Sequence, residues 1–164
     1  MSSSTVKRLI LYRFDRQPSE AFVHTDAYLT ATGVELMTPE GNVQSIDYTY
    51  VKALCFAAEG APADLFSTSL AFDRRPKTPG LWASFQLRDG DVLEGILPHN
   101  LLEWPPQGFL FTPPRAGAFR QRVFLPREAV KETILRGTVG KAAQPKKAAK
   151  SGYDTKQMNM FDPA

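Results

Sequence analysis

Helical periodicity is nearly absent from this chain, and its absence limits what the chain can fold into. Apolar residues recur instead in short runs that are separated by turn residues, a pattern typical of β-strands. The first five runs predict strands at Val6–Phe14, Ala21–Leu29, Gly33–Thr38, Val43–Asp47 and Val51–Ala57. The first 57 residues are therefore predicted to fold as β-strands.

The pattern loosens after Ala57 and restarts at Leu81. A second set of strands is predicted at Leu81–Leu87, Val92–Leu97, Gly108–Thr112, Arg122–Leu125 and Val130–Leu135. The two sets look like one unit written twice, because residues 33–39 align with 108–114 and Val51-Lys52 aligns with Val130-Lys131. An internal repeat is therefore expected.

Five short, strongly bent strands around a small core are typical of SH3-like and Sm-like small barrels. We predict two tandem barrels, at residues 5–57 and 81–137, that are joined by a linker at 58–80. Because a unit of about 55 residues buries too little surface to be stable by itself, we expect the barrels to pack together and share a core. The residues expected to fill this shared core are Trp82, Phe85, Phe109, Phe111 and Phe124.

The composition changes abruptly after Gly137. Residues 138–164 hold five lysines and two aspartates, so the whole net charge of +3 lies there, and the other residues carry 15 positive and 15 negative groups. Most of this segment is rich in Ala, Lys, Gly and Pro, and such a composition cannot offset the entropy cost of ordering. We predict a flexible basic tail. The neutral folded part argues against a face that binds a nucleic-acid duplex.

Few residues suit catalysis or metal binding. The chain has one cysteine, Cys55, and two histidines, His24 and His99, without the spacing of a metal site or a catalytic set. No disulfide, metal or cofactor is expected, and the protein is predicted not to be an enzyme. No apolar run approaches the roughly 18 residues that span a bilayer, and the start lacks the apolar stretch of a secretory signal. These features predict a cytoplasmic protein without membrane contact.

A family resemblance rests on the second half of the chain. Residues 81–137, with LRDGDVLEGILP, GFLFTPP and QRVFLPREAV, resemble an uncharacterised bacterial family found alone or attached to PilZ-type and receiver-type signalling proteins. The first half, ending YVKALCF, resembles the companion repeat of that family. The resemblance covers most of residues 6–137 and implies a fold. It also leaves open a signalling-associated protein-interaction adaptor with an inert tail.

A second resemblance lies at residues 89–95. The sequence DGDVLEG is similar to the first motif of Sm-like RNA-binding proteins, in which a hairpin precedes a strongly bent strand, and Gly95 would allow that bend. The asparagine of the Sm RNA-binding loop has no clear counterpart, because Asn100 comes too early, and residues 135–137 match the second Sm motif poorly. Single-stranded RNA binding is kept as an alternative function.

A third resemblance lies near the C-terminus. The sequence QMNMF at residues 157–161 resembles the pentapeptide by which bacterial polymerases and repair proteins dock on the DNA sliding clamp. Gln157 would hydrogen-bond at the mouth of a pocket, and Met158, Met160 and Phe161 would enter an apolar groove, where methionine adapts its shape easily. The alternative is a short apolar end that folds back on the barrels or has no partner.

Two basic clusters are candidate contacts for an anion or a nucleic acid. Arg74, Arg75 and Lys77 lie between the two barrels, where ligands often bind, although a solvated linker is the alternative. The other cluster is in the tail, at Lys146, Lys147 and Lys150, which would lie beside DNA held in a clamp. The sequence as a whole predicts a binding or adaptor protein whose C-terminal motif docks on a protein partner, most specifically the bacterial sliding clamp. It leaves the oligomeric state open.

Overall fold

The computed structural model of the chain describes residues 5–67 and 70–140. These residues form ten β-strands and three short 3-10 helices, which confirms the all-β prediction. None of the helices in these two ranges is long and apolar enough to cross a membrane.

The first unit contains five antiparallel strands. They are β1 (Val6–Arg13), β2 (Ser19–His24), β3 (Gly33–Met37), β4 (Val43–Asp47) and β5 (Val51–Phe56), with the 3-10 helix η1 (Tyr48–Tyr50) directly before β5. Consecutive strands pair from β1 to β4, and β5 returns to pair with β1. The resulting order, β4-β3-β2-β1-β5, is that of a five-stranded small barrel.

The second unit repeats this plan. Its elements are β6 (Gly80–Leu87), β7 (Val92–Leu97), η2 (Leu101–Glu103), β8 (Gly108–Phe111), β9 (Arg122–Pro126), η3 (Arg127–Ala129) and β10 (Val130–Val139). The last strand, β10, returns to pair with β6. Two backbone hydrogen bonds between Ile96 and Thr112, of 2.9 and 3.0 Å, link the end of β7 to the residue after β8.

The strand register supports the internal repeat position by position. Gly33 lies opposite Asp47 in the first unit, as Gly108 lies opposite Pro126 in the second. The fifth strand of each unit also has a register shift after its first residue. In β5 the extra residue is Lys52 and in β10 it is Lys131, and each interrupts the pairing of its strand. The sequence alignment of the two halves is therefore also a structural alignment.

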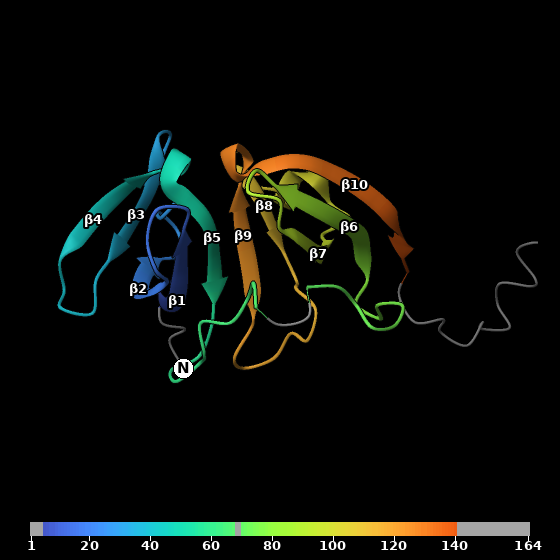
Figure 1. Cartoon of the computed structure of the whole chain (residues 1–164), viewed down its shortest axis with the longest axis horizontal. Helices are drawn as coiled ribbons and strands as arrows, with labels where there is room; N and C mark the ends of the chain where they lie inside the picture. The colour runs from blue at the N-terminus through green and yellow to red at the C-terminus, as the bar shows by residue number, and fades with distance from the viewer. Residues whose placement is uncertain (1–4, 68–69, 141–164) are drawn as a thin grey trace, which may run out of the picture.

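A strand pair joins the two units. β5 of the first unit pairs antiparallel with β9 of the second, with Leu54 opposite Phe124 and Cys55 opposite Val123. Figure 1 shows these two strands side by side in the middle of the molecule. We call this pair the seam. It produces one seven-stranded sheet, β4-β3-β2-β1-β5-β9-β8, that runs through both units, beside a three-stranded sheet, β10-β6-β7.

The seam makes the hydrophobic core common to both units. Alternate side chains of β1 and β5 enter two different clusters: Leu9, Leu11, Leu54 and Phe56 enter the first, and Ile10, Tyr12, Ala53 and Cys55 enter the second. The second cluster is filled mainly by Phe85, Phe111 and other residues of the second unit. Because β1 and β5 are buried on both faces, the expected shared core is present.

Some sequence expectations differ from the structure in detail. Residues 58–80 are more than a linker, because Leu65 is buried in the second cluster and its amide donates a 3.1 Å hydrogen bond to the Tyr12 hydroxyl. Trp82 and Phe109 are half-buried rather than central. β2 ends at His24, before a turn, and β10 continues to Val139, two residues past the predicted end of the second barrel.

Two equivalent glycines provide a test of the repeat. A Cβ on Gly108 would collide with the Leu125 carbonyl, and one on Gly33 would collide with the equivalent Ile46 carbonyl. Since both obstacles are backbone atoms that cannot turn aside, we expect Gly33→Ala and Gly108→Ala each to lower the free energy of unfolding by about 2 kcal/mol or more. Denaturant titration measures the change.

Gly117→Ala is the matched control. Nothing lies within 4 Å of a Cβ at Gly117, and its φ is not positive, so its effect should stay within about 0.5 kcal/mol. If the Gly108→Ala protein were as stable as this control, Gly108 of β8 would not lie as close to the Leu125 carbonyl of β9 as the structure places it.

Candidate functional site

The site residues predicted from the sequence fall into two groups. Gln157, Met158, Met160, Phe161, Lys146, Lys147 and Lys150 lie outside the described residues. Arg74, Arg75 and Lys77 lie inside them, in the segment that leads into β6.

The structure gathers Arg74, Arg75 and Lys77 around a surface hollow of about 420 Å³. The opposite wall is the segment after β8, which adds a fourth cation, Arg115. We call this site the basic hollow. Sequence reasoning missed Arg115 because it lies far along the chain from the other three cations, and only the link between β7 and β8 brings its segment to the same place.

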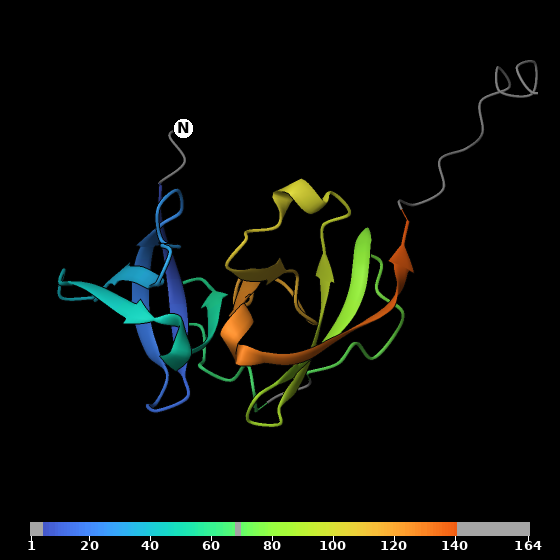
Figure 2. The same ribbon diagram turned by 90° about the horizontal axis from the view of Figure 1, so that it is seen from above.

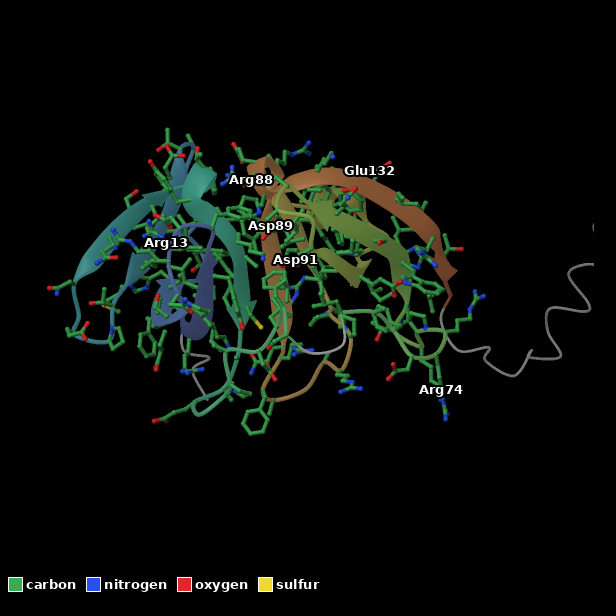
Figure 3. All side chains as sticks on the ribbon, viewed as in Figure 1. Arg13, Arg74, Arg88, Asp89, Asp91 and Glu132 are labelled. Carbon is green, nitrogen blue, oxygen red and sulfur yellow. The ribbon has the colours of Figure 1, made fainter. Side chains whose placement is uncertain are left out.

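The basic hollow is electropositive but partly neutralised. Its wall includes one carboxylate, Asp73, which lies 3.5 Å from Arg115 in an ion pair open to solvent. Arg75 donates a 3.2 Å hydrogen bond to the carbonyl of Thr138 in β10. Arg74 points away from the body of the protein in Figure 3. Four cations against one anion favour a negatively charged ligand.

A second cavity lies on the seam. Phe56 of β5 and Arg122 of β9, which are opposite each other in the register, line a pocket of about 320 Å³ together with Tyr28 and Leu110. The Tyr28 ring packs edge-on against Phe56 at 5.7 Å, and burial raises its pKa despite the nearby Arg122. The lining of this seam pocket thus combines two aromatic rings, Tyr28 and Phe56, with two cations, Arg122 and Lys7.

A polar cluster locks the two units together at the other end of the seam. The Lys52 ammonium of the first unit lies 2.6 Å from the Asp89 carboxylate and 2.5 Å from that of Asp91, both in the β6–β7 turn. The neighbouring Arg88 lies 3.9 Å above the Phe14 ring and donates to the carbonyl of Thr49. Figure 3 shows Arg88, Asp89 and Asp91 together between the units.

The pKa values in this cluster follow from the ion pair. Burial alone would lower the pKa of Lys52, but its hydrogen bonds with Asp89 and Asp91 outweigh burial and raise the pKa above 10.5. Burial alone would raise the pKa of Asp89, but the hydrogen bond and the charge of Lys52, together with hydrogen bonds from backbone amides, outweigh burial and lower the pKa below 3.8. The folded state thus favours the charged form of both groups.

Several side chains of potentially reactive types make structural contacts instead. Cys55 is buried, and that burial raises the pKa of its thiol to about 11. Glu94 accepts hydrogen bonds from the Phe72 amide at 2.9 Å and the Trp82 indole at 3.2 Å. A ring nitrogen of His99 lies 3.0 Å from the Val139 carbonyl. Within residues 5–67 and 70–140, no three His, Cys, Asp or Glu side chains come together as a metal site.

Comparison with known proteins gives one match. The sequence profile of DUF6982, a family of unknown function, matches residues 5–136, a range that covers both units and the segment between them. No curated protein and no solved structure matches the chain. The expected membership of an uncharacterised family is confirmed.

The Lys52 cluster predicts a pH-dependent stability. We expect Lys52→Met to lower the free energy of unfolding at pH 7 by about 1 to 2 kcal/mol, a modest loss because Asp89 and Asp91 keep a third or more of their exposure. Asp89 has a lowered pKa, so its contribution exists above pH 3.8 and is lost as the pH falls further. The difference between wild type and variant should therefore fade below about pH 4.

Lys131→Met is the control, since Lys131 holds the equivalent position in β10 and is exposed. Denaturant titrations between pH 7 and pH 3 would compare all three proteins. A Lys52→Met deficit that stays constant over this range would contradict an electrostatic origin.

Proposed function

We propose that this chain, which belongs to the DUF6982 family of unknown function, is a non-enzymatic binding or adaptor protein that docks on a DNA sliding clamp through residues 157–161. The observation that carries the proposal is the sequence QMNMF near the C-terminus. The proposal places the protein in the cytoplasm, with the replication or repair machinery.

The residue types of the motif suit a groove on a protein partner. Phe161 supplies a large aromatic anchor, the kind of side chain that dominates binding energy at interfaces. Met158 and Met160 adapt their shape to an apolar groove at low cost, and Gln157 offers both a donor and an acceptor at its mouth.

The folded body is compatible with this docking. β10 ends at Val139, at the opposite end of the molecule from β4 (Figure 1), and Gln157 follows 18 residues later. Fully extended, a segment of this length spans at most about 65 Å. The motif can thus reach a groove while the body stays folded beside the partner. Lys146, Lys147 and Lys150 lie within this segment, where they would contact DNA held by the clamp.

The functional groups of the body also favour binding over catalysis. The Cys55 thiol is buried, and Glu94 and His99 are held by structural hydrogen bonds. The basic hollow and the seam pocket are open to solvent, and both suit a ligand contact.

Two other functions stay alternatives. A signalling-associated adaptor would use the folded body and not the motif. A single-stranded RNA-binding protein of the Sm kind would bind through the body, and the observation in its favour is the basic hollow, whose walls include Arg74, Arg75, Lys77 and Arg115.

The clamp proposal predicts direct binding. A peptide spanning residues 156–164 should bind the sliding clamp of the same organism with a Kd on the order of micromolar, and the change of both Gln157→Ala and Phe161→Ala should abolish that binding because it removes the hydrogen-bonding group and the anchor. Isothermal titration calorimetry measures both peptides.

The full chain serves as the second arm, with Asn159→Ala as the matched control inside the motif. If the full chain binds the clamp equally well with and without Gln157 and Phe161, the motif is not the docking site. Affinity for single-stranded RNA that falls steeply with salt and survives the motif changes would favour the Sm-like alternative.

A further inference from the structure

Two strand edges in the described part of the chain have no partner strand. The described strands form one continuous series, because the hydrogen bonds between Ile96 and Thr112 link the two sheets where β7 and β8 meet. β4 is the outer strand at one end of this series and β10 is the outer strand at the other. In Figures 1 and 2, β4 lies at one end of the molecule and β10 runs from the middle of the molecule to the other end.

The internal repeat identifies what these edges are. β4 is the fourth strand of its unit, as β9 is in the second unit, and β10 is the fifth strand of its unit, as β5 is in the first. The seam is a fifth strand of one unit paired with a fourth strand of the other. β10 and β4 therefore have the same kinds of edge as the two strands of the seam, and both edges are unpaired within the described part of one chain.

We propose that β10 of one copy of this chain pairs with β4 of a second copy, in the antiparallel register of the seam, so that the protein self-associates head to tail. The template is the interface already present inside the chain, and the partner is a second copy because only another fourth strand offers the edge that β5 uses. The inference does not depend on residues 157–161.

The seam fixes the register of the new pair. Structural equivalence converts Leu54–Phe124 into Thr133–Ser45, Cys55–Val123 into Ile134–Gln44, and Phe56–Arg122 into Leu135–Val43. None of the six residues so paired between copies is charged, so no like charges oppose each other. Thr133 opposite Ser45 is a favourable cross-strand hydroxyl pair.

The same register brings exposed apolar side chains together. Val43 is 69% exposed, Leu135 is 59% exposed and Ile134 is 53% exposed, although all three are large and apolar. Leu135 would lie directly opposite Val43 and shield it from water. The edge strands thus carry apolar residues at the positions where the pairing needs them.

The Lys52 cluster at the seam also has a counterpart in the proposed pair. Lys52 binds Asp89, two residues after the end of β6. Lys131 is equivalent to Lys52, and Asp15, two residues after the end of β1, is equivalent to Asp89. In the proposed pair, Lys131 of one copy would face Asp15 of the next, and the charges are opposite. Asp15 already accepts hydrogen bonds of 2.8 and 3.0 Å from Arg13, so Lys131 would share this carboxylate with Arg13.

The assembly differs from the seam in strength and in closure. Leu54 and Phe124 are fully buried at the seam, whereas their equivalents Thr133 and Ser45 are polar, so the contact between copies is weaker and reversible. Because β4 and β10 are different surfaces at opposite ends, each contact leaves one of each free, and association can continue to longer chains or close into a ring.

Complementary edge variants test the proposal. Val43→Pro blocks β4, because Val43 is the first residue of that strand and a proline there removes a backbone N–H from the edge. Leu135→Lys blocks β10, while Val92→Lys changes an exposed apolar residue elsewhere as the control. Sedimentation equilibrium from about 1 to 500 µM covers the range in which a weak contact changes its occupancy. Wild type and Val92→Lys should associate with rising concentration, and each edge variant alone should stay monomeric. Circular dichroism checks that all are folded.

The mixture of the two edge variants is decisive. The Val43→Pro protein keeps an intact β10 and the Leu135→Lys protein an intact β4, so a 1:1 mixture should form a dimer that grows no further. A wild-type protein that is monomeric at every concentration would overturn the proposal. So would a Val43→Pro protein that still dimerises alone, because that result means symmetric pairing through β10.

Cysteine cross-linking checks the register. A Val43→Cys protein mixed with a Leu135→Cys protein should form a disulfide-linked dimer on oxidation, because directly opposite residues have Cβ atoms within bonding reach. Ile134→Cys is the control, since its side chain points to the other face of the strand. Equal cross-linking by Ile134→Cys and Leu135→Cys would overturn the proposed register.

Discussion

The pairing of β5 with β9 is the constraint on which the rest of the structure depends. A five-stranded unit could in principle close on itself, with its fifth strand beside its fourth. Here β5 pairs instead with β9, so β5 and β1 are covered on both faces and the two cores share them. Neither unit has a complete core without the other, as the small size of each requires.

The same pairing places the sites. The seam pocket exists because Phe56 and Arg122 come from different units and meet across the seam. The Lys52 cluster likewise joins one unit's fifth strand to the other unit's hairpin turn. The free edges β4 and β10 are what remains after the seam has used one fourth and one fifth strand. Binding surfaces and stability thus have one structural origin.

The repeat and the strands could be predicted from local patterns. The alignment of Gly33 with Gly108 holds because each glycine meets an equivalent carbonyl that leaves no space for a Cβ. The seam was not predicted, because alternation within a strand does not specify a distant partner. One signal was present: Ala53–Phe56 is apolar at every position, as expected for a strand buried on both faces.

The candidate sites also differ in whether the sequence alone reveals them. Arg74, Arg75 and Lys77 are adjacent in sequence and could be found there, whereas Arg115 joins them only through the fold. The seam pocket draws on several strands and has no sequence signature. Residues 157–161 lie outside the described residues, and their role stays a prediction.

Native-state amide hydrogen exchange tests most directly whether the seam makes the two units one cooperative structure. The most protected amides of β1, β5, β6 and β9 should all exchange with one free energy, equal to that of global unfolding by denaturant. If the protected amides of one unit instead exchanged at a clearly lower free energy than those of the other, the units would unfold independently, and the seam would not be the interaction that holds the protein together.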